Sequence, residues 1–473
     1  VEDFNMGAME NKGLNVFNTS CVLASPDTAT DEAYQRVEAV VAHEYFHNWS
    51  GNRVTCRDWF QLSLKEGFTV FRDAEFSSDM NSRSVKRIED VGLLRSIQFA
   101  EDAGPLAHPV RPSSYMEISN FYTTTIYEKG AEVVRMYHTL LGADAFRQGT
   151  DLYFDRHDGT AATTDDFAQA MADAGNVDLA QFKRWYEQPG TPNVSVSESY
   201  AEGTLTLQIT QSPATLPNQE HQKPFHMPLA LGFVGADGNS VVLNQTDVTS
   251  DAAVAIRDGG ETVLLEAKES EHELSINHLS AKPVVSFLRE FSAPVKVSHQ
   301  RNAEELAFLV EHDTDGFVRW DAMQTLWMEH FDTNINATVD PVVTLGGLAK
   351  GALALETPEQ QMLAATMLAV PNENYLFEQL RGFDVDALLD ARDAAVENAA
   401  QAHVQTWEAL VAMHDSGQAY QADASGMARR ALGNTAFSYL AKTQTGAVLE
   451  ELLQTRYAKA DNLTDRRTVL AIA

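Results

Sequence analysis

The feature that most constrains this chain is the segment His-Glu-Tyr-Phe-His at residues 43–47, followed by a glutamate at residue 66. Residues i and i+4 lie on one face of a helix, so His43 and His47 can ligate one metal ion if this segment is helical. Glu44 lies beside them and can hold a water without ligating the metal. Glu66 completes a set of two histidines and one carboxylate, which is typical of catalytic zinc sites with an open fourth position. The alternative is an amphipathic helix with two ordinary histidines.

The surrounding sequence predicts two helices that would converge on one ion. Residues 33–49 carry valines at helical spacing, follow an acidic pair and precede Gly51. Residues 61–76 form a second helical pattern, which presents Glu66. Asp73, further along this second helix, either orients a ligating imidazole or is a solvated acid, and the pattern slightly favours the solvated acid.

A second motif lies at the start of the chain, Met-Gly-Ala-Met-Glu-Asn at residues 6–11. Gly7 permits a close backbone approach or an unusual φ, and Glu10 places a carboxylate nearby. Apolar residues at 14–17 predict a short strand after the motif. Taken alone, the pattern is consistent with a turn that carries a solvated glutamate.

Tyr127 is a third candidate. It enters a helical pattern that runs to about Leu141 and stops at Gly142. Spacing alone predicts only a half-buried aromatic residue here, and Tyr122 offers a rival phenol five residues earlier. The pattern by itself therefore does not choose which tyrosine would donate a hydrogen bond to reacting atoms.

Together these motifs resemble the M1 family of zinc aminopeptidases, a gluzincin family, most closely its bacterial members. The resemblance covers the whole chain and is carried by residues 7–11, 43–47, 49–60, 65–67 and 127–131. It implies an α+β multidomain fold with a thermolysin-like zinc catalytic domain, a small β-sandwich-like domain and a C-terminal α-helical, solenoid-like domain. It also implies an internal fragment, because the family's N-terminal β domain would precede Val1 and the end of the helical domain would follow Ala473.

The resemblance implies a role for each matching residue. His43, His47 and Glu66 would ligate one Zn²⁺ per chain. Glu44 would be the general base that takes a proton from the zinc-activated water, and Tyr127 would stabilise the tetrahedral oxyanion. The implied substrate-binding residues are Met6, Gly7, Ala8, Met9, Glu10 and Asn11.

Within the substrate-binding set, Glu10 would bind the free α-ammonium group of a peptide. A buried carboxylate favours a cation and disfavours a blocked N-terminus. Gly7 and Ala8 would contact the substrate backbone, and Met6 would either line the pocket for the first side chain or simply pack. The expected reaction is the release of single N-terminal amino acids from peptides with a free N-terminus.

Three other functions are compatible with parts of the sequence. A branch of the family hydrolyses a lipid epoxide, but it has glycine where this chain has Ala8. An endopeptidase would not need Glu10 and would also cleave an N-acetylated substrate. A non-enzymatic zinc scaffold would not need Glu44 or Tyr127.

Composition limits the partners and the compartment. The chain has 35 Lys and Arg against 67 Asp and Glu, a net charge of −32, which disfavours nucleic acid and anionic membranes. No run of eighteen apolar residues predicts a membrane-spanning helix. Cys21 and Cys56 are the only cysteines, and we expect both to be buried free thiols in a reducing compartment. The expected protein is a monomer in the bacterial cytoplasm, and a targeting signal upstream of Val1 stays compatible with the sequence.

A length of 473 residues predicts about three domains. Residues 1–191 would form the catalytic domain, with a boundary signal at Gly-Thr-Pro. Residues 192–292 change to period-two alternation and would form the β-sandwich-like domain. Residues 293–473 carry helical stripes and would form the incomplete helical domain, which the resemblance places over the active site. Further helices are predicted at 85–101, 126–141, 144–157 and 164–187, and strands at 204–209, 229–233, 240–243 and 262–266.

Overall fold

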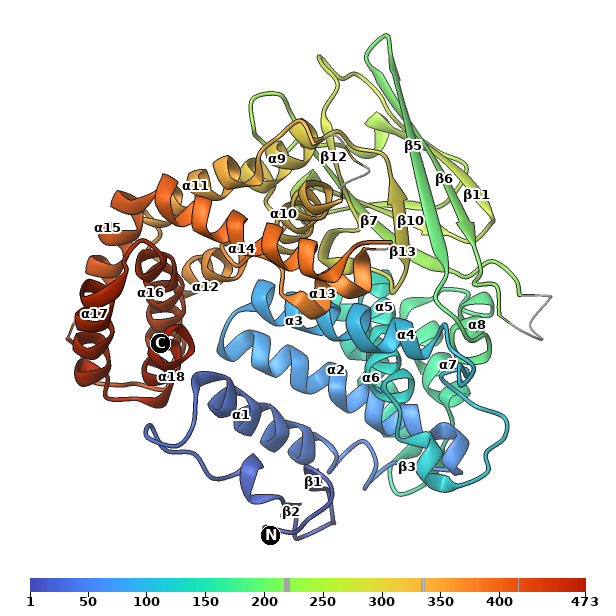
Figure 1. Cartoon of the computed structure of the whole chain (residues 1–473). Coiled ribbons are helices and arrows are strands. Elements are labelled where there is room, and N and C mark those ends of the chain that lie inside the picture. Colours follow the sequence, from blue (N-terminus) through green and yellow to red (C-terminus); the bar gives the residue numbers. More distant parts are fainter. Residues whose placement is uncertain (217–221, 333–334, 336, 381, 416) are drawn as a thin grey trace.

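The computed structural model describes residues 1–216, 222–332, 335, 337–380, 382–415 and 417–473. Figure 1 shows a mainly helical N-terminal region in blue and teal, a β region in green and yellow, and an array of helices in orange and red. The array curves so that its last helices return to the N-terminal region. Among the described residues, no helix is both long enough and apolar enough to cross a membrane.

Two long helices, α1 (Asp31–Phe46) and α2 (Leu62–Met80), form the centre of the N-terminal region and pack against each other. The hydroxyl of Thr30 caps α1 by accepting a hydrogen bond from the backbone N–H of Ala33. The rings of Phe46 and Phe68 join the two helices edge to face, with centroids 5.1 Å apart. The remaining helices are α3 (Arg83–Leu93), α4 (Phe99–Glu101), α5 (Gly130–Leu141), α6 (Ala143–His157), α7 (Thr164–Gly175) and α8 (Arg184–Glu187). Two short strand pairs are β1 (Ala8–Met9) with β2 (Val16–Phe17), and β3 (Thr55–Cys56) with β4 (Ala161–Ala162).

Three predicted helices have different bounds in the structure. The helix predicted at 33–49 ends at Phe46, because the chain turns back through Gly51, whose φ is +118°. The helix predicted at 164–187 is divided, since Asn176 adopts a left-handed conformation with φ of 50° and ends α7. A π-helical turn at Leu94–Gln98 interrupts the helix predicted at 85–101.

The β region consists of two packed sheets. One has the order β13-β5-β6-β11-β8 and the other β12-β7-β10-β9. The strands are β5 (Asn193–Ala201), β6 (Thr204–Ser212), β7 (Met227–Val234), β8 (Val248–Ser250), β9 (Val254–Arg257), β10 (Thr262–Ala267), β11 (Glu271–Ile276), β12 (Val284–Phe287) and β13 (Lys296–His299). All residues of β7 are buried, so this strand is covered on both faces and does not alternate between core and solvent.

Two details of the β region differ from the sequence pattern. The strand predicted at 240–243 does not form, and only Ser240 makes an isolated bridge, to Val234. β13 lies after residue 292 yet pairs in parallel with β5. The division of the chain at 292 stays a prediction.

The C-terminal array consists of packed helices whose small residues permit close contact. Of the helical stripe predicted at Leu388, Ala391, Ala395 and Ala399, all but Ala391 are buried. Trp407 stacks on Tyr439 with ring centroids 4.4 Å apart. The helices are α9 (Ala303–His312), α10 (Gly316–Phe331), α11 (Pro341–Ala352), α12 (Pro358–Met367), α13 (Glu373–Gln379), α14 (Val385–Ala402), α15 (Val404–His414), α16 (Ala424–Lys442), α17 (Gly446–Lys459) and α18 (Leu463–Ile472).

The array closes back onto the start of α1. Arg430 of α16 forms a bidentate ion pair with Asp31, with Nε–Oδ2 at 2.7 Å and Nη2–Oδ1 at 2.8 Å. The backbone N–H of Asp31 donates to the hydroxyl of Thr464, just inside α18. Figure 1 shows α16 and α18 beside this end of α1. The helix that carries the two histidines is therefore anchored at its N-terminus by residues about 400 positions later.

Candidate metal and catalytic centre

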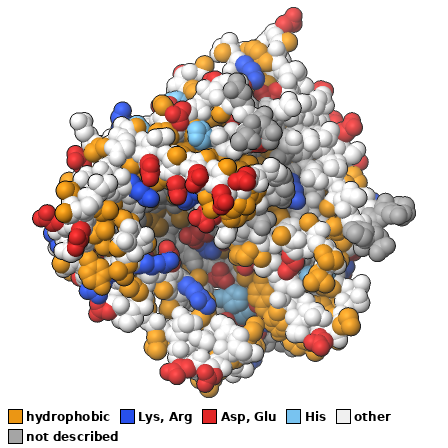
Figure 2. Space-filling model, in the orientation of Figure 1, with side chains coloured by type: hydrophobic (Ala, Val, Ile, Leu, Met, Phe, Trp, Pro, Cys, Tyr) orange, Lys and Arg blue, Asp and Glu red, His pale blue; other side chains and the backbone are white. Residues whose placement is uncertain are grey.

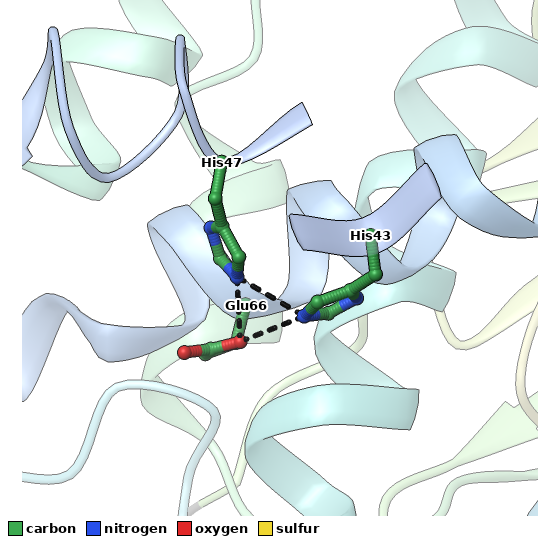
Figure 3. Close-up of side chains that lie close together, drawn as sticks. All are labelled: His43, His47 and Glu66. Atoms are coloured by element: carbon green, nitrogen blue, oxygen red, sulfur yellow. Dashed lines mark hydrogen bonds and ion pairs between the residues drawn. The ribbon is translucent and has the colours of Figure 1, made fainter. Parts of the chain in front are cut away.

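The three predicted ligands converge in the structure (Figure 3). His43 and His47 lie one turn apart at the C-terminal end of α1, and their Nε2 atoms are 3.0 Å from each other. Glu66, from α2, places Oε2 3.4 Å from Nε2 of His43 and 3.3 Å from Nε2 of His47. Two nitrogen atoms and one carboxylate oxygen thus face a common point, as a metal site requires.

Both imidazoles are held by their other nitrogen. Nδ1 of His43 lies 2.7 Å from Oδ2 of Asp73, and Nδ1 of His47 lies 2.7 Å from the carbonyl of Ser50. Because carbonyl and carboxylate oxygens accept, Nδ1 is assigned as the donor in each ring, which directs Nε2 towards the common point. The half-buried Asp73 is therefore an orienting group, and the solvated acid that the sequence slightly favoured is wrong.

The electrostatics of this cluster fit a cation. Burial lowers the pKa of His43, but Asp73 and Glu66 outweigh burial and raise it to about 10. Burial raises the pKa of Glu66, but hydrogen bonds from both histidines, together with Lys65, hold it well below its usual range. The cluster attracts positive charge to the same atoms that would ligate zinc, so the residues present fit the metal.

Glu44 lies beside the ligands. Its side chain is buried, and Oε2 has no hydrogen-bond partner among the described residues. Burial raises the pKa of Glu44, although the two histidines oppose this shift. A carboxylate with a free oxygen and a raised pKa suits a general base.

Two glycines allow α2 to approach the segment that carries Tyr127. A Cβ on Gly67 would lie 2.6 Å from the backbone of Gly130, and a Cβ on Gly130 would lie 3.3 Å from Gly67. Gly67 follows Glu66 by one position, and Gly130 follows Tyr127 by three positions. A side chain at either glycine would clash with the other segment. The two glycines therefore permit the close packing that brings Glu66 and Tyr127 together.

Tyr127 lies half-buried in the π-helical turn Thr125–Lys129. Burial raises the pKa of Tyr127, so the phenol stays protonated and can donate. The rival Tyr122 is 42% exposed, and its ring lies 6.3 Å from that of Tyr127. Tyr127 is thus the more buried of the two phenols, and its role in stabilising the oxyanion stays a prediction.

Glu10 is buried at the same centre and is fixed by two residues that the sequence did not single out. Nζ of Lys65 lies 2.8 Å from Oε1 of Glu10 and also contacts Oε1 of Glu66. The side-chain amide of Asn52 donates to the backbone carbonyl of Glu10 at 2.7 Å. Burial raises the pKa of Glu10, but Lys65 and His47 outweigh it, so the pKa falls below its usual value. Lys65 and Asn52 lie in the segments 65–67 and 49–60 that carry the family resemblance, but the sequence assigned neither of them a role.

The rest of the first motif lies on the surface. Met6, Gly7, Met9 and Asn11 are exposed, and Ala8 is half-buried in the two-residue strand β1. The backbone carbonyl of Gly7 accepts from Asn18 at 2.9 Å, which holds the motif in a hairpin. In Figure 2, the face is hollowed near its middle, between the C-terminal helices and the N-terminal region, with Lys, Arg and His side chains at the hollow.

A second group of possible ligands overlaps the first. Atoms of Glu10, Glu44 and His47 lie within 4.8 Å of one another. Two carboxylates and one imidazole are a harder donor set than two imidazoles and one carboxylate, and Glu10 is already engaged by Lys65. The set formed by His43, His47 and Glu66 is the better match to zinc.

Both cysteines are free thiols. Cys21 is buried, as expected, whereas Cys56 is only half-buried. Sγ of Cys56 contacts the carbonyl of Gln61 at 3.3 Å, and burial raises the pKa of this thiol to about 12.

Comparison with protein families divides the chain into three parts. Residues 1–186 match the peptidase family M1 domain. Residues 190–300 match a domain of unknown function, DUF3458, with an Ig-like fold, and residues 303–473 match its C-terminal companion, DUF3458_C, described as ARM repeats. The predicted fold class, a catalytic domain followed by a β-sandwich-like and a solenoid-like helical domain, is confirmed.

Individual relatives match over nearly the whole chain. Aminopeptidase N of Escherichia coli (strain K12) is 43% identical over 483 residues, which cover 100% of this chain and 54% of the relative. Aminopeptidase N of Caulobacter vibrioides is 45% identical over 477 residues, covering 98% and 52%. The crystal structure of Legionella pneumophila aminopeptidase A in complex with aspartic acid superposes with a TM-score of 0.82 at 26% identity, covering 100% and 52%. The chain spans about half the length of these relatives.

Proposed function

Residues 1–186 match the peptidase family M1 domain, and from this match we propose that the chain is a zinc-dependent aminopeptidase of that family. It would release single N-terminal amino acids from peptides. One observation carries the proposal: two imidazoles and a carboxylate converge beside a buried glutamate with a free oxygen, and a second buried glutamate lies at the same centre. The relatives named Aminopeptidase N support the same reading.

In this proposal, His43, His47 and Glu66 hold the zinc ion. Zinc bound there would supply a Lewis acid that polarises the peptide carbonyl and acidifies a water. Glu44 accepts a proton at its unpartnered Oε2 and later returns a proton to the leaving amine. The hydroxyl of Tyr127 donates a hydrogen bond to the negative charge that develops on the carbonyl oxygen.

Glu10 would set the register of the substrate. Its carboxylate already holds one ammonium group, that of Lys65, at 2.8 Å. A peptide with a free N-terminus offers a second ammonium group, and a carboxylate with a lowered pKa stays ionised to receive it. Met6, Gly7, Ala8, Met9 and Asn11 would line the path of the substrate on either side.

The proposal is tested by comparing alanyl-p-nitroanilide with its N-acetyl counterpart as substrates of the zinc-loaded chain. We expect hydrolysis of the free amine and at least a hundredfold slower hydrolysis of the acetylated compound, because acetylation removes the cation that Glu10 would bind. Equal cleavage of both compounds would favour an endopeptidase. Cleavage of neither by a chain that contains one zinc ion would contradict the proposal for this chain.

The compartment and the oligomeric state are further proposals. Two free cysteines and bacterial relatives support a reducing bacterial compartment. Size-exclusion chromatography with light scattering would test the expected monomer of 52.1 kDa.

A further inference from the structure

A cavity of about 540 Å³ lies where the three regions of the molecule meet, apart from the candidate active site. Its walls come from α4 and the preceding π-helical turn of the N-terminal region, from β12 and β13 of the β region, and from α10 and α13 of the helical array. A volume of this size suits a small organic molecule and is too large for a single inorganic ion.

The cavity is rich in positive charge. Arg95, Lys296 and Arg301 line it, and Asp321 is the only acid among the lining residues. The chain as a whole has the opposite balance, with 67 acids against 35 Lys and Arg. A local excess of cations in such an acidic protein favours the entry of an anion.

Arg301 is the unusual member of this group. Its Nε is buried and has no hydrogen-bond partner, and within the described part of the chain its guanidinium forms no ion pair. Burial lowers the pKa of Arg301, which reflects a desolvated positive charge. An arginine stays charged under these conditions, and this half-buried guanidinium has no ion pair of its own, so an anion with two oxygens would give it a partner.

Four acids near Arg301 are engaged elsewhere, and a fifth, Glu329, acts on Arg301 through space but forms no ion pair with it among the described residues. Asp321 pairs with Arg95 at 2.5 Å, and Glu198 contacts His299 at 2.6 Å. Glu305 pairs with Lys282 at 3.0 Å, and Asp313 lies 3.4 Å from Arg289. These four acids act on Arg301 only through space, and none lies within ion-pair distance of it.

The cavity also has a large apolar lining. Phe99, Phe287, Phe317 and Met328 line it, and Nζ of Lys296 lies 5.9 Å from the ring centre of Phe99. A ligand that fills the cavity therefore needs an apolar body as well as an anionic head.

We propose that this junction cavity binds a small organic anion, with a carboxylate or phosphate head on Arg301 and Lys296 and an aromatic or aliphatic body against the phenylalanines. Both head groups share the planar or tetrahedral arrangement of oxygens that a guanidinium recognises with two hydrogen bonds. Because the walls come from three regions, a bound anion would also hold these regions together and raise the melting temperature.

The test is isothermal titration calorimetry on the full chain with phenyl phosphate, 3-phenylpropanoate and the neutral 3-phenylpropanamide. We expect saturable binding of at least one anion, at least tenfold weaker binding of the amide, and at least tenfold weaker anion binding by Arg301→Met. Arg147→Met is the matched control, because Arg147 is exposed on α6 and outside the cavity. The two anions distinguish a phosphate site from a carboxylate site.

Lys296→Met provides a second variant on an exposed strand position, where misfolding is not a concern. It should also weaken anion binding, by a smaller factor than Arg301→Met. Absence of saturable binding of both anions, equal binding of the amide, or unchanged anion binding by both variants would overturn the proposal. Metal loading and peptidase activity do not enter these readouts.

Discussion

Buried positive charge has different partners at the candidate active site and at the junction cavity. At the active site, Lys65 contacts Glu10 and Glu66, and His43 contacts Asp73 and Glu66. At the junction, Arg301 forms no ion pair within the described residues, and four of the acids near it are paired with other groups. The difference indicates that positive charge at the candidate active site pairs with the protein's own carboxylates, whereas positive charge at the junction cavity is available to a ligand.

The largest effect should follow from Glu44→Gln. This change keeps the shape of the side chain but removes the base, so turnover should fall by about three orders of magnitude or more while zinc stays bound. Steady-state hydrolysis of alanyl-p-nitroanilide and metal analysis of the same sample would measure both. Glu32→Gln, at an exposed position of the same helix, is the control and should retain activity. Near-normal turnover of Glu44→Gln would remove this residue from the proposed chemistry.

The next effect concerns metal affinity. Glu66→Ala removes one of three ligand side chains and should weaken zinc binding by more than about a hundredfold, because even the groups that merely orient ligands contribute tenfold to a hundredfold. Competition with a fluorescent zinc chelator would give the affinity. Unchanged affinity would show that the ion is held by other groups.

Lys65→Met tests how much the paired cation at the candidate active site contributes to stability. It leaves the carboxylates of Glu10 and Glu66 buried without their shared cation, and we expect the zinc-free chain to lose about 4 kcal/mol of unfolding free energy. Denaturant unfolding would measure the loss, with Lys350→Met on the exposed side of α11 as control. Added zinc should restore part of the stability, since it returns positive charge to Glu66. A loss of unfolding free energy no larger than that of the control would mean that Lys65 does not stabilise the two carboxylates.

Glu75 of α2 tests the effect of ion pairing outside the ligand cluster and the junction cavity. Burial raises its pKa, but Arg135 and Arg83 outweigh burial and hold it at about 2. Its folded pKa lies below the usual value of 4.5, so its contribution of about 3 kcal/mol is present above pH 4.5 and is lost as the pH falls towards 2. The difference in unfolding free energy between the native chain and Glu75→Gln should shrink over this range. A difference independent of pH would contradict the shift.

The smallest effect is expected at the junction. Arg301→Met removes a charge that has no partner, so the unfolding free energy should change by less than about 1 kcal/mol, in either direction. The same denaturant titration on Lys65→Met compares the loss of a paired lysine with the loss of an unpaired arginine. A loss of several kcal/mol would show that Arg301 has a structural partner and would weaken the case for a ligand.

The sequence predicted the parts of the molecule that depend on short spacing. The i, i+4 histidines of α1 and the alternation at 204–209 specify their local structure directly, because helices and strands have fixed periods. The end of α1 at Phe46 was missed, because the turn through Gly51 depends on a close approach to His47, where a Cβ would lie 3.2 Å from Nδ1. Contacts made only in the folded chain, such as Asn52 with Glu10, leave no periodic signal.

The junction shows the same limit more strongly. Arg301 looks in the sequence like any surface arginine, and its lack of an ion pair becomes apparent only in the folded chain, where nearby acids such as Glu305 and Asp313 contact other residues. The orienting contact of Asp73 was an open alternative for the same reason, since the sequence places it on the correct helix but not against His43.

The most direct test of the central claim is to locate zinc by anomalous diffraction at the zinc edge, in crystals of the full chain grown with the metal. We expect one peak between Nε2 of His43, Nε2 of His47 and the carboxylate of Glu66. A peak among Glu10, Glu44 and His47, or a chain that binds no zinc at either group, would contradict it.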